Sequence, residues 1–506
     1  MIQGTGSGVG KSVITAAFCR WFHLQGWRVA PFKAQNMSLN SYVTADGGEM
    51  GRAQVYQAEA CGIPPHVAMN PVLLKPCGDN LSQVIVMGKV VATRNAKDYY
   101  ADKPRFIKEV ASAFEYLKNK YEMVILEGAG SPAEINLREQ DFVNMAMADM
   151  ADAPVLIVGD IDRGGVFAWM KGTYDLLTPP EQDRVKGFLI NKFRGDMDLL
   201  RPGVEQFEAM VQKPVLGVIP FDRELYVDEE DAIPTWDRGK RAPGQGLLDI
   251  AIIRLPRISN FTDFAPLVLE PGCAVRYVWH PDQMGNPDLI IIPGTKNTLD
   301  DMKFLKDQKL DRSILHGHRE GCIVLGVCGG FQMLGKTLCD PHHIESKESE
   351  VNGLGLMDSS STLLKKKITR QVTSATVASP VFGAGLIAEG YEIHMGITTF
   401  QNNPRPLFEN QNGGNSLNLG SCNQDGTLIG TYLHGFFDRD ELRHAFLNFV
   451  RSKRGLPIPD EKLDYQKVRN DQLNRLARLI SGSVDMKQVE QIMGLEKSGS
   501  LQDRQG

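Results

Sequence analysis

Apolar and polar residues follow one another along the chain in a pattern that predicts buried parallel strands separated by helices. Short β-branched runs that end in Gly, Pro or Asp recur with helical stretches between them, as is typical of strands covered on both faces. We expect one α/β unit over residues 1–222. Its clearest strand runs begin at Met123 (MVILEGAG), Pro154 (PVLIVGDID), Val185 (VKGFLINKF) and Pro214 (PVLGVIP).

A second series of strands predicts another α/β domain, over residues 248–450. A stretch within it, from about Ser361 to Thr399, alternates between apolar and polar residues as antiparallel strands do. The other strand runs begin at Leu248 (LDIAIIRL), Asp288 (DLIIIPGT), Cys322 (CIVLGVCGG) and Leu428 (LIGTYLHGFF).

The remaining segments carry no strand pattern. Residues 223–247 are polar, hold prolines and glycines and show no periodicity, so we interpret them as a linker. Residues 451–506 are charged and include Leu473, Leu476 and Ile480 at helical spacing, which predicts a C-terminal helix and tail.

Composition narrows the class of protein. The 506 residues carry 56 basic and 61 acidic side chains, a net charge of −5, so we expect no nucleic-acid partner, because phosphate binding needs clustered cations. No apolar run reaches the roughly 18 residues that a membrane span needs. Eight cysteines without a C-x-x-C pair do not form a disulfide scaffold. We therefore expect a cytoplasmic protein without a membrane partner.

Residues 4–12 read GTGSGVGKS, a glycine-rich phosphate loop in front of a predicted helix. Glycines allow backbone N–H groups to converge on phosphate oxygens, a lysine reaches the β- and γ-phosphates, and a hydroxyl at the helix N-terminus can ligate Mg²⁺. The loop departs from G-x-x-x-x-G-K-[ST], because Thr5 stands where the first glycine should be. The residues expected to bind ATP are Gly4, Thr5, Gly8, Gly10, Lys11 and Ser12.

The loop, with Lys33 in PFKAQN and the EGAG that starts at Glu127, resembles the dethiobiotin synthetase branch of P-loop proteins. The resemblance implies phosphoryl transfer to a carboxyl-type group, with Lys33 at that reaction. It also implies that Asp46 and Glu127 ligate Mg²⁺ together with Ser12. Asn191 resembles the branch's adenine-contacting asparagine, with a turn-forming asparagine as the alternative.

A cysteine lies at a strand–turn–helix junction in the second domain. Residues 322–334 read CIVLGVCGGFQML, the pattern of a nucleophile elbow with Cys328 in place of serine. Small flanking residues allow the strained turn, and the helix N-terminus lowers the thiol pKa toward the reactive thiolate. The backbone N–H groups of Gly329 and Gly294 are the expected oxyanion donors. The alternative is a buried structural cysteine.

A cysteine nucleophile needs a base, and His434 in GTYLHGFF ends an apolar run. His394 in GYEIHMG is the alternative. With Cys328, this histidine resembles the class I, triad-type glutamine amidotransferases. Most of them carry a carboxylate two residues after the histidine, where this chain has Phe436, and the subgroup acting on corrinoid precursors also lacks it. The third member stays unassigned, with Glu392 as a candidate.

Longer segments carry a closer resemblance, to the cobyric acid synthase family. The segments, in order, are KAQNMSLNS at Lys33, TADGGEMGRAQ at Thr44, MNPVLLKP at Met69, EGAGSPAEINL at Glu127 and DIDRGGVFA at Asp160. The resemblance implies two α/β domains: an N-terminal P-loop parallel-sheet domain and a C-terminal class I glutamine amidotransferase-like domain.

The activity implied is ATP- and glutamine-dependent amidation of the b, d, e and g propionates of adenosylcobyrinic acid a,c-diamide through acyl phosphates, in cobalamin biosynthesis. The implied cofactors are ATP and Mg²⁺, and the partners are glutamine and a corrinoid. The cobalt belongs to the corrin ring, so no metal-ligand cluster is expected in the protein. The sequence assigns no oligomeric state.

Two alternatives remain open. Cobyrinic acid a,c-diamide synthase has the same domain order, but the KAQNMSLNS and SPAEINL segments favour cobyric acid synthase. A non-enzymatic nucleotide switch of the partition-ATPase type also carries a deviant P-loop. Such a switch would have no use for Cys328 and His434.

Overall fold

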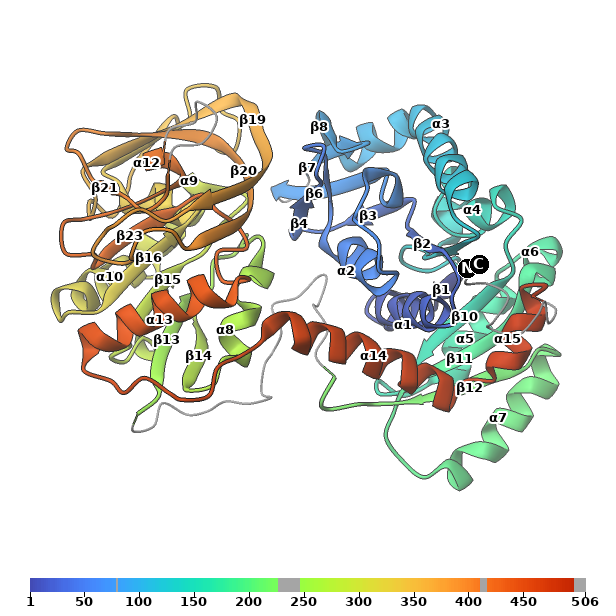
Figure 1. The fold of residues 1–506 in the computed structure, drawn as a ribbon. Coiled ribbons are helices and arrows are strands. Elements are labelled where there is room, and N and C mark those ends of the chain that lie inside the picture. The colour runs from blue at the N-terminus through green and yellow to red at the C-terminus, as the bar shows by residue number, and fades with distance from the viewer. Residues whose placement is uncertain (79–80, 226–245, 410–415, 496–506) are drawn as a thin grey trace.

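The computed structural model describes residues 1–78, 81–225, 246–409 and 416–495. Two α/β domains lie side by side, with the N-terminal domain on the right of Figure 1. Most of the predicted linker, 223–247, falls outside the described residues. None of the helices in the described part of the chain is both long and apolar enough to cross a bilayer.

A parallel sheet forms the centre of the N-terminal domain, in the order β2–β9–β1–β10–β11–β12, with a bridge from Ile2 to Glu127 joining its two parts. The strands predicted at Met123, Pro154, Val185 and Pro214 are confirmed. The strands are β1 (Ile2–Gly4), β2 (Val29–Phe32), β9 (Met123–Leu126), β10 (Val155–Asp160), β11 (Val185–Phe193) and β12 (Val215–Pro220). The helices of this domain are α1 (Lys11–Leu24), α2 (Arg52–Ala60), α3 (Ala96–Lys120), α4 (Met145–Met150), α5 (Val166–Asp175), α6 (Pro179–Arg184) and α7 (Met197–Val211).

A second, smaller sheet in this domain was not predicted from the sequence. It has the order β3–β6–β7–β8, and a hairpin of β4 and β5 lies beside α2. Several of these strands are partly exposed and short, so they lack the continuous apolar runs that mark the central strands. The strands are β3 (Gln35–Met37), β4 (Ser41–Val43), β5 (Glu49–Gly51), β6 (Val72–Gly78), β7 (Leu81–Val86) and β8 (Lys89–Asn95).

The C-terminal domain has a seven-stranded sheet in the order β14–β13–β15–β16–β23–β22–β21, parallel through β23 and antiparallel beyond it. The strands are β13 (Leu248–Ile253), β14 (Cys273–Val278), β15 (Leu289–Ile292), β16 (Ile323–Val327), β21 (Arg405–Pro406), β22 (Gly420–Cys422) and β23 (Leu428–Thr431). The helices are α8 (Ala265–Leu269), α9 (Thr298–Asp307), α10 (Leu310–Arg319), α11 (Gly329–Leu334), α12 (Ser416–Leu419) and α13 (Asp440–Arg454).

A second sheet of the C-terminal domain, β18–β17–β19–β20, contains the predicted antiparallel pair as a long hairpin that faces the N-terminal domain (Figure 1). Its strands are β17 (Thr337–Cys339), β18 (Glu350–Asn352), β19 (Ser359–Ala375) and β20 (Ile387–Phe400).

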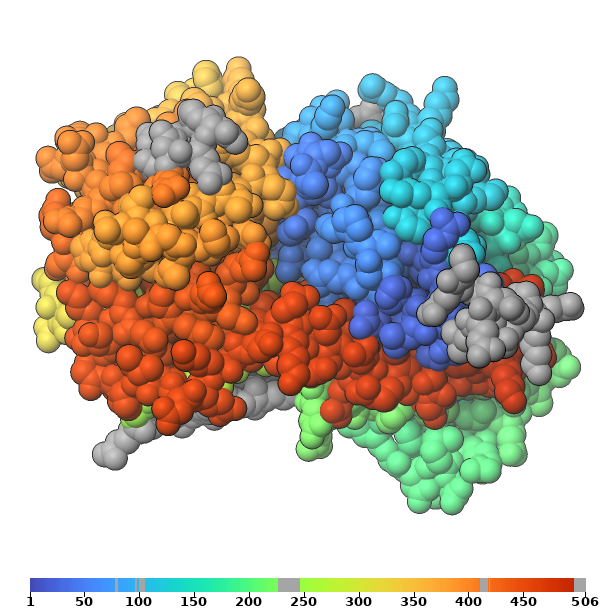
Figure 2. Space-filling model, in the orientation of Figure 1, coloured from blue at the N-terminus to red at the C-terminus, as the bar shows by residue number. Residues whose placement is uncertain are grey.

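The predicted C-terminal helix is confirmed as α14 (Tyr465–Ser483), and it packs on the N-terminal domain. Its apolar face shares a core with α1 and β1, and the Arg20 guanidinium donates to Asn474 at 2.8 and 3.0 Å. Part of the predicted tail forms α15 (Met486–Ile492), which belongs to the same core. In Figure 2 the red end of the chain runs from α13 on the C-terminal lobe to α14 and α15 on the N-terminal lobe, so it ties the domains together.

A buried ion cluster joins the domains where the long hairpin meets β5 and β6. Lys75 Nζ lies 2.9 Å from Glu49 Oε1, and Lys367 of β19 pairs with Glu49 Oε2. Lys367 also donates to Gln83 at 3.1 Å. Burial raises the pKa of Glu49, but the two lysine charges outweigh it and hold the pKa at about 2.

Replacing Glu49 by glutamine leaves two buried lysines without their counter-ion. We expect the free energy of unfolding to fall by about 3–5 kcal/mol at neutral pH, measured by urea denaturation. Because the folded pKa lies below the unfolded one, this stabilisation is fully present above about pH 4.5 and is lost as the pH falls toward 2. The control, Glu389→Gln, breaks an exposed pair with Arg439 and should cost less than about 1 kcal/mol. Equal losses would contradict this assignment.

Candidate active sites

The phosphate loop connects β1 to α1 and is fixed by its own backbone. Gly8 and Gly10 adopt left-handed φ angles of 73° and 100°, and a Cβ on Gly10 would lie 2.1 Å from the Asn191 side chain. Lys11 Nζ donates to the carbonyl oxygens of Gly6 (2.8 Å) and Gly130 (3.0 Å). The loop therefore has the shape and charge to surround phosphate oxygens at the N-terminus of α1.

Glu127 follows β9 and lies beside the phosphate loop. Its carboxylate accepts from Ser12 Oγ at 2.7 Å and from Gln57 Nε2, and Lys33 Nζ lies 2.9 Å from it. Burial alone raises the pKa of Glu127, but the Lys33 charge and these hydrogen bonds lower it. The hydroxyl of Ser12 and the charged carboxylate are hard oxygen donors side by side, so they fit a Mg²⁺ ion.

Two residues predicted for this site have other contacts. Asp46 lies in the turn between β4 and β5, where Thr44 donates to its carboxylate and thereby lowers its pKa. The contacts described for Asp46 do not join it to Ser12 or Glu127. Asn191 ends the buried part of β11, and its Nδ2 donates to the Val9 carbonyl of the phosphate loop at 2.8 Å.

Cys328 lies at a sharp turn between β16 and α11, as the sequence predicts. Its backbone has φ 51° and ψ −109°, outside the regions that side chains usually adopt, as is typical of strained functional turns. Cβ atoms could not be added to the neighbouring glycines: at Gly326 one would lie 2.6 Å from the Gly330 carbonyl, and at Gly330 one would lie 1.9 Å from Ile292 O. The thiol is buried, with Sγ 3.6 Å from the Ile393 carbonyl.

His434 lies beside this thiol, and the Nδ1 edge of its ring contacts a carboxylate. Its Nδ1 is 2.6 Å from Asp263 Oδ2, and its ring stacks on Tyr391 with centroids 5.3 Å apart. Burial lowers the pKa of His434, but the Asp263 charge and hydrogen bond, with a smaller effect of Cys328, raise it to about 10. A carboxylate only accepts, so Nδ1 carries a proton and Nε2 is the ring nitrogen that Asp263 does not use.

Sequence reasoning missed Asp263, which lies in a short helical turn after β13. The candidate that it offered, Glu392, pairs with Arg370 and lies 3.6 Å from His394. The signal that could have found Asp263 is its place in the loop after a parallel strand, since such loops meet at one edge of the sheet. The carboxylate that contacts His434 thus comes from 171 positions earlier in the chain.

The two glycines predicted to donate to an oxyanion flank the thiol. A Cβ on Gly294 would lie 3.4 Å from His434 Cε1 and 3.5 Å from Cys328 Cβ. Gly329 is the first residue of α11, and a Cβ on it would lie 3.2 Å from the Thr295 backbone nitrogen. Both backbones therefore lie close to Cys328 or to the loop beside it, as an oxyanion donor to this thiol must.

The thiol opens into a cavity of about 40 Å³ between the domains. Its wall includes Lys75 of the N-terminal domain, so the cavity is completed across the interface. The C-terminal domain contributes, among others, Lys296, Cys328, Glu345, Lys367 and His434.

The N-terminal domain also contacts the loop that carries Asp263. Asn260 Nδ2 donates to the Ser41 carbonyl at 3.1 Å and to Tyr391 Oη at 2.9 Å. The Phe261 backbone N–H donates to Asn40 Oδ1 at 3.0 Å. The His434–Asp263 pair is therefore supported from the partner domain of the same chain.

Comparison with known proteins agrees with this two-site architecture. Residues 1–234 match the CobQ/CobB/MinD/ParA nucleotide binding domain, and residues 249–442 match the CobB/CobQ-like glutamine amidotransferase domain. The cobyric acid synthase of Thermoanaerobacter sp. (strain X514) is 46% identical over 97% of this chain and 98% of that protein.

Two further relatives show the same full-length match. The cobyric acid synthase of Dehalococcoides mccartyi (strain CBDB1) is 47% identical over 97% of this chain and 98% of its own. That of Clostridium tetani (strain Massachusetts / E88) is 45% identical over 98% of this chain and 99% of its own. The nucleotide-binding and amidotransferase domains, in this order and over nearly the whole length, show that the chain belongs to the cobyric acid synthase family.

Proposed function

We propose that the protein amidates the b, d, e and g propionates of adenosylcobyrinic acid a,c-diamide, using ATP to activate each carboxylate as an acyl phosphate and glutamine as the nitrogen source. The observation that supports this most is the pairing, in one chain, of the Ser12–Glu127 phosphate site with a Cys328–His434–Asp263 site whose cavity is closed by the nucleotide-binding domain.

At the glutaminase site, Cys328 is the nucleophile. Asp263 stabilises the His434 imidazolium that forms as the thiol gives up its proton, and the sulfur attacks the side-chain amide carbon of glutamine. The N–H groups of Gly294 and Gly329 stabilise the oxyanion of the tetrahedral intermediate. His434 then protonates the leaving nitrogen, and water hydrolyses the thioester to glutamate.

At the phosphate site, Lys11 and the loop backbone hold the ATP phosphates, with Gly4, Thr5, Gly8 and Gly10 shaping the loop. Mg²⁺, when bound, would supply positive charge to offset the negative charge of the phosphates.

The other residues of this site would hold Mg²⁺ and the carboxylate that accepts the phosphoryl group. Ser12 and Glu127 would hold the ion, and Asp46 stays a family-based prediction as a third ligand. Lys33, which pairs with Glu127, would orient the carboxylate that accepts the phosphoryl group, and Asn191 remains the predicted adenine contact.

Ammonia must pass from Cys328 to the acyl phosphate before it is protonated in solvent. The β6 residue Lys75 closes the glutaminase cavity from the side of the N-terminal domain. We therefore propose that the nitrogen crosses at this interface. Free competition by labelled ammonium against glutamine-derived nitrogen during turnover would refute such a passage.

Replacing Cys328 by alanine should abolish glutamine-dependent amidation, because no thioester can form. With ATP and the a,c-diamide, mass spectrometry should show up to four added amide nitrogens for the unsubstituted protein given glutamine. The Cys328→Ala variant should form these amides when ammonium is supplied and should form none from glutamine. Unchanged glutamate release by the variant would refute the amidotransferase role, and absence of product from the unsubstituted protein would refute the substrate assignment.

Replacing Asp263 by asparagine should reduce kcat/KM for glutamine hydrolysis by about 10²- to 10⁴-fold, by analogy with loss of the orienting carboxylate in hydrolase triads. The Asp263 charge raises the pKa of His434, so without it the imidazolium loses its proton at lower pH. The alkaline limb of the pH–rate profile should therefore move to lower pH. Glu392→Gln is the matched control, and an equal shift there would contradict the assignment of Asp263.

Replacing Glu127 by glutamine removes the charged metal ligand but keeps the shape of the side chain. We expect ATP turnover to fall by at least about 100-fold, since a catalytic metal supplies several kcal/mol. A titration of activity against Mg²⁺ should show a higher requirement. Asp46→Asn in the same titration tests the remaining ligand: an unchanged Mg²⁺ requirement would remove Asp46 from the ligand set.

A further inference from the structure

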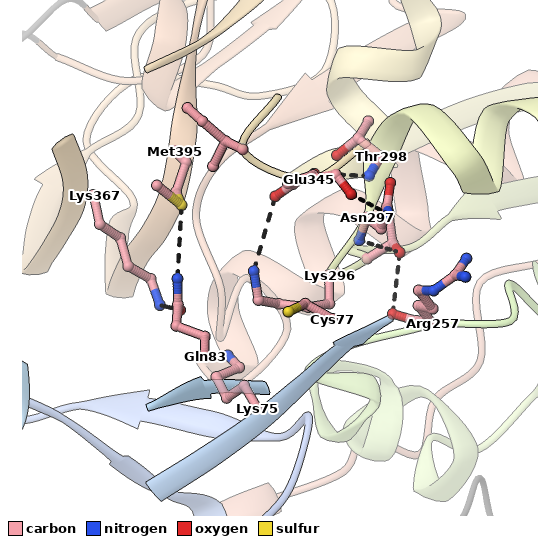
Figure 3. A network of polar contacts seen from close by, with 12 residues as sticks. Lys75, Cys77, Gln83, Arg257, Lys296, Asn297, Thr298, Glu345, Lys367 and Met395 are labelled. Atoms are coloured by element: carbon pink, nitrogen blue, oxygen red, sulfur yellow. Dashed lines mark hydrogen bonds and ion pairs between the residues drawn. The ribbon is translucent and has the colours of Figure 1, made fainter. Parts of the chain in front are cut away.

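A buried pair of opposite charges lies in the wall of the glutaminase cavity and has no part in the chemistry described above. Lys296 Nζ is 4.0 Å from Glu345 Oε1, and the two side chains are 9% and 8% exposed. Figure 3 shows the two charged ends pointing toward each other across this gap, beside Lys75 and Lys367. Both residues line the same cavity as Cys328.

The gap between these charges is too long for a hydrogen bond. Glu345 Oε2 accepts from the Thr298 backbone N–H at 2.9 Å, which leaves Oε1 facing Lys296. Buried charges that are not fully hydrogen-bonded cost free energy, so the pair is a poor device for stability alone. An arrangement of this kind suits a ligand that supplies one positive and one negative group.

The backbone fixes the pair relative to the thiol. Lys296 lies in the loop between β15 and α9, two residues after the proposed oxyanion donor Gly294. Asn297 of the same loop donates from Nδ2 to the Glu345 carbonyl at 2.6 Å. The cation, the anion and the oxyanion donor are thus held on one connected set of loops.

The other charges around the cavity are already compensated. Lys75 and Lys367 share the carboxylate of Glu49. Among the described residues that line the cavity, Glu345 is the single carboxylate. It is therefore the lining residue that can bind an ammonium group with a full opposite charge.

We propose that Lys296 binds the α-carboxylate of glutamine and Glu345 binds its α-ammonium group, so that this pair selects the free amino acid while its side-chain amide lies at Cys328. The assignment rests on the proposed glutaminase function and deepens it. Charge-assisted contacts to both ends of the head group explain how the site would distinguish glutamine from other primary amides.

The cavity volume of about 40 Å³ has room for a few water molecules. Glutamine displaces that water, and its entry requires the side chains that narrow the cavity to shift. Lys367 and Met395 of the hairpin line the cavity, and Gln83 of the N-terminal domain contacts both side chains (Figure 3). Substrate entry is thereby linked to the domain interface.

Two amides that each lack one charge test the assignment through ammonia release. The compound 4-carbamoylbutanoate is glutamine without its amino group, and 4-aminobutanamide is glutamine without its carboxylate. Glu345→Gln should lower kcat/KM for glutamine by about 10- to 100-fold and leave that for 4-carbamoylbutanoate unchanged. Lys296→Gln should do the same for glutamine and leave that for 4-aminobutanamide unchanged.

Lys303→Gln is the control, because Lys303 lies on the adjoining helix α9 and forms an exposed pair with Glu348. It should leave all three rates unchanged, and amidation with ammonium should stay constant in all three variants. Equal losses for glutamine and both analogues would mean a structural role and overturn the head-group site. Unchanged glutamine kinetics in both variants would also overturn it while leaving the proposed function intact. Absence of ammonia release from the unsubstituted protein would overturn both.

Discussion

The close packing of backbone against backbone at Cys328 is the constraint on which the glutaminase half of the molecule depends. Gly330 lies so close to the β15 carbonyl of Ile292 that no side chain fits, and Gly430 of β23 lies equally close to the Phe331 ring. This contact presses the start of α11 onto the sheet and forces the left-handed φ at Cys328. The strained turn in return presents the thiol at the helix N-terminus, where it can react.

Buried charges elsewhere in the molecule are held by partners from distant parts of the chain. Glu127 meets Lys33 and Ser12, and Asp263 meets His434. Such pairs contribute little net stability, since desolvation offsets most of their attraction. Their use here is to set protonation: Glu127 stays ionised beside the phosphate loop, and His434 stays protonated beside the thiol.

The domain interface forms part of the glutaminase site, and one N-terminal segment links that interface to the phosphate site. The segment after Lys33 runs from the carboxylate of Glu127 to the contact of Ser41 with Asn260, next to Asp263. The helix α14 returns from the C-terminal domain and joins the core beside α1, directly behind the phosphate loop.

The sequence by itself determined the two α/β domains, the phosphate loop, the cysteine turn and His434, because each is written in a contiguous run of residues whose local geometry follows from glycine, apolar and hydroxyl positions. The tertiary structure decided which distant residues contact these motifs. It brought Asp263 and not Glu392 to His434, placed Asp46 in a turn with Thr44, and sent the C-terminal helix to the N-terminal domain. Those contacts depend on which loops converge at the edge of a sheet and on the packing of segments hundreds of residues apart, which no local pattern encodes.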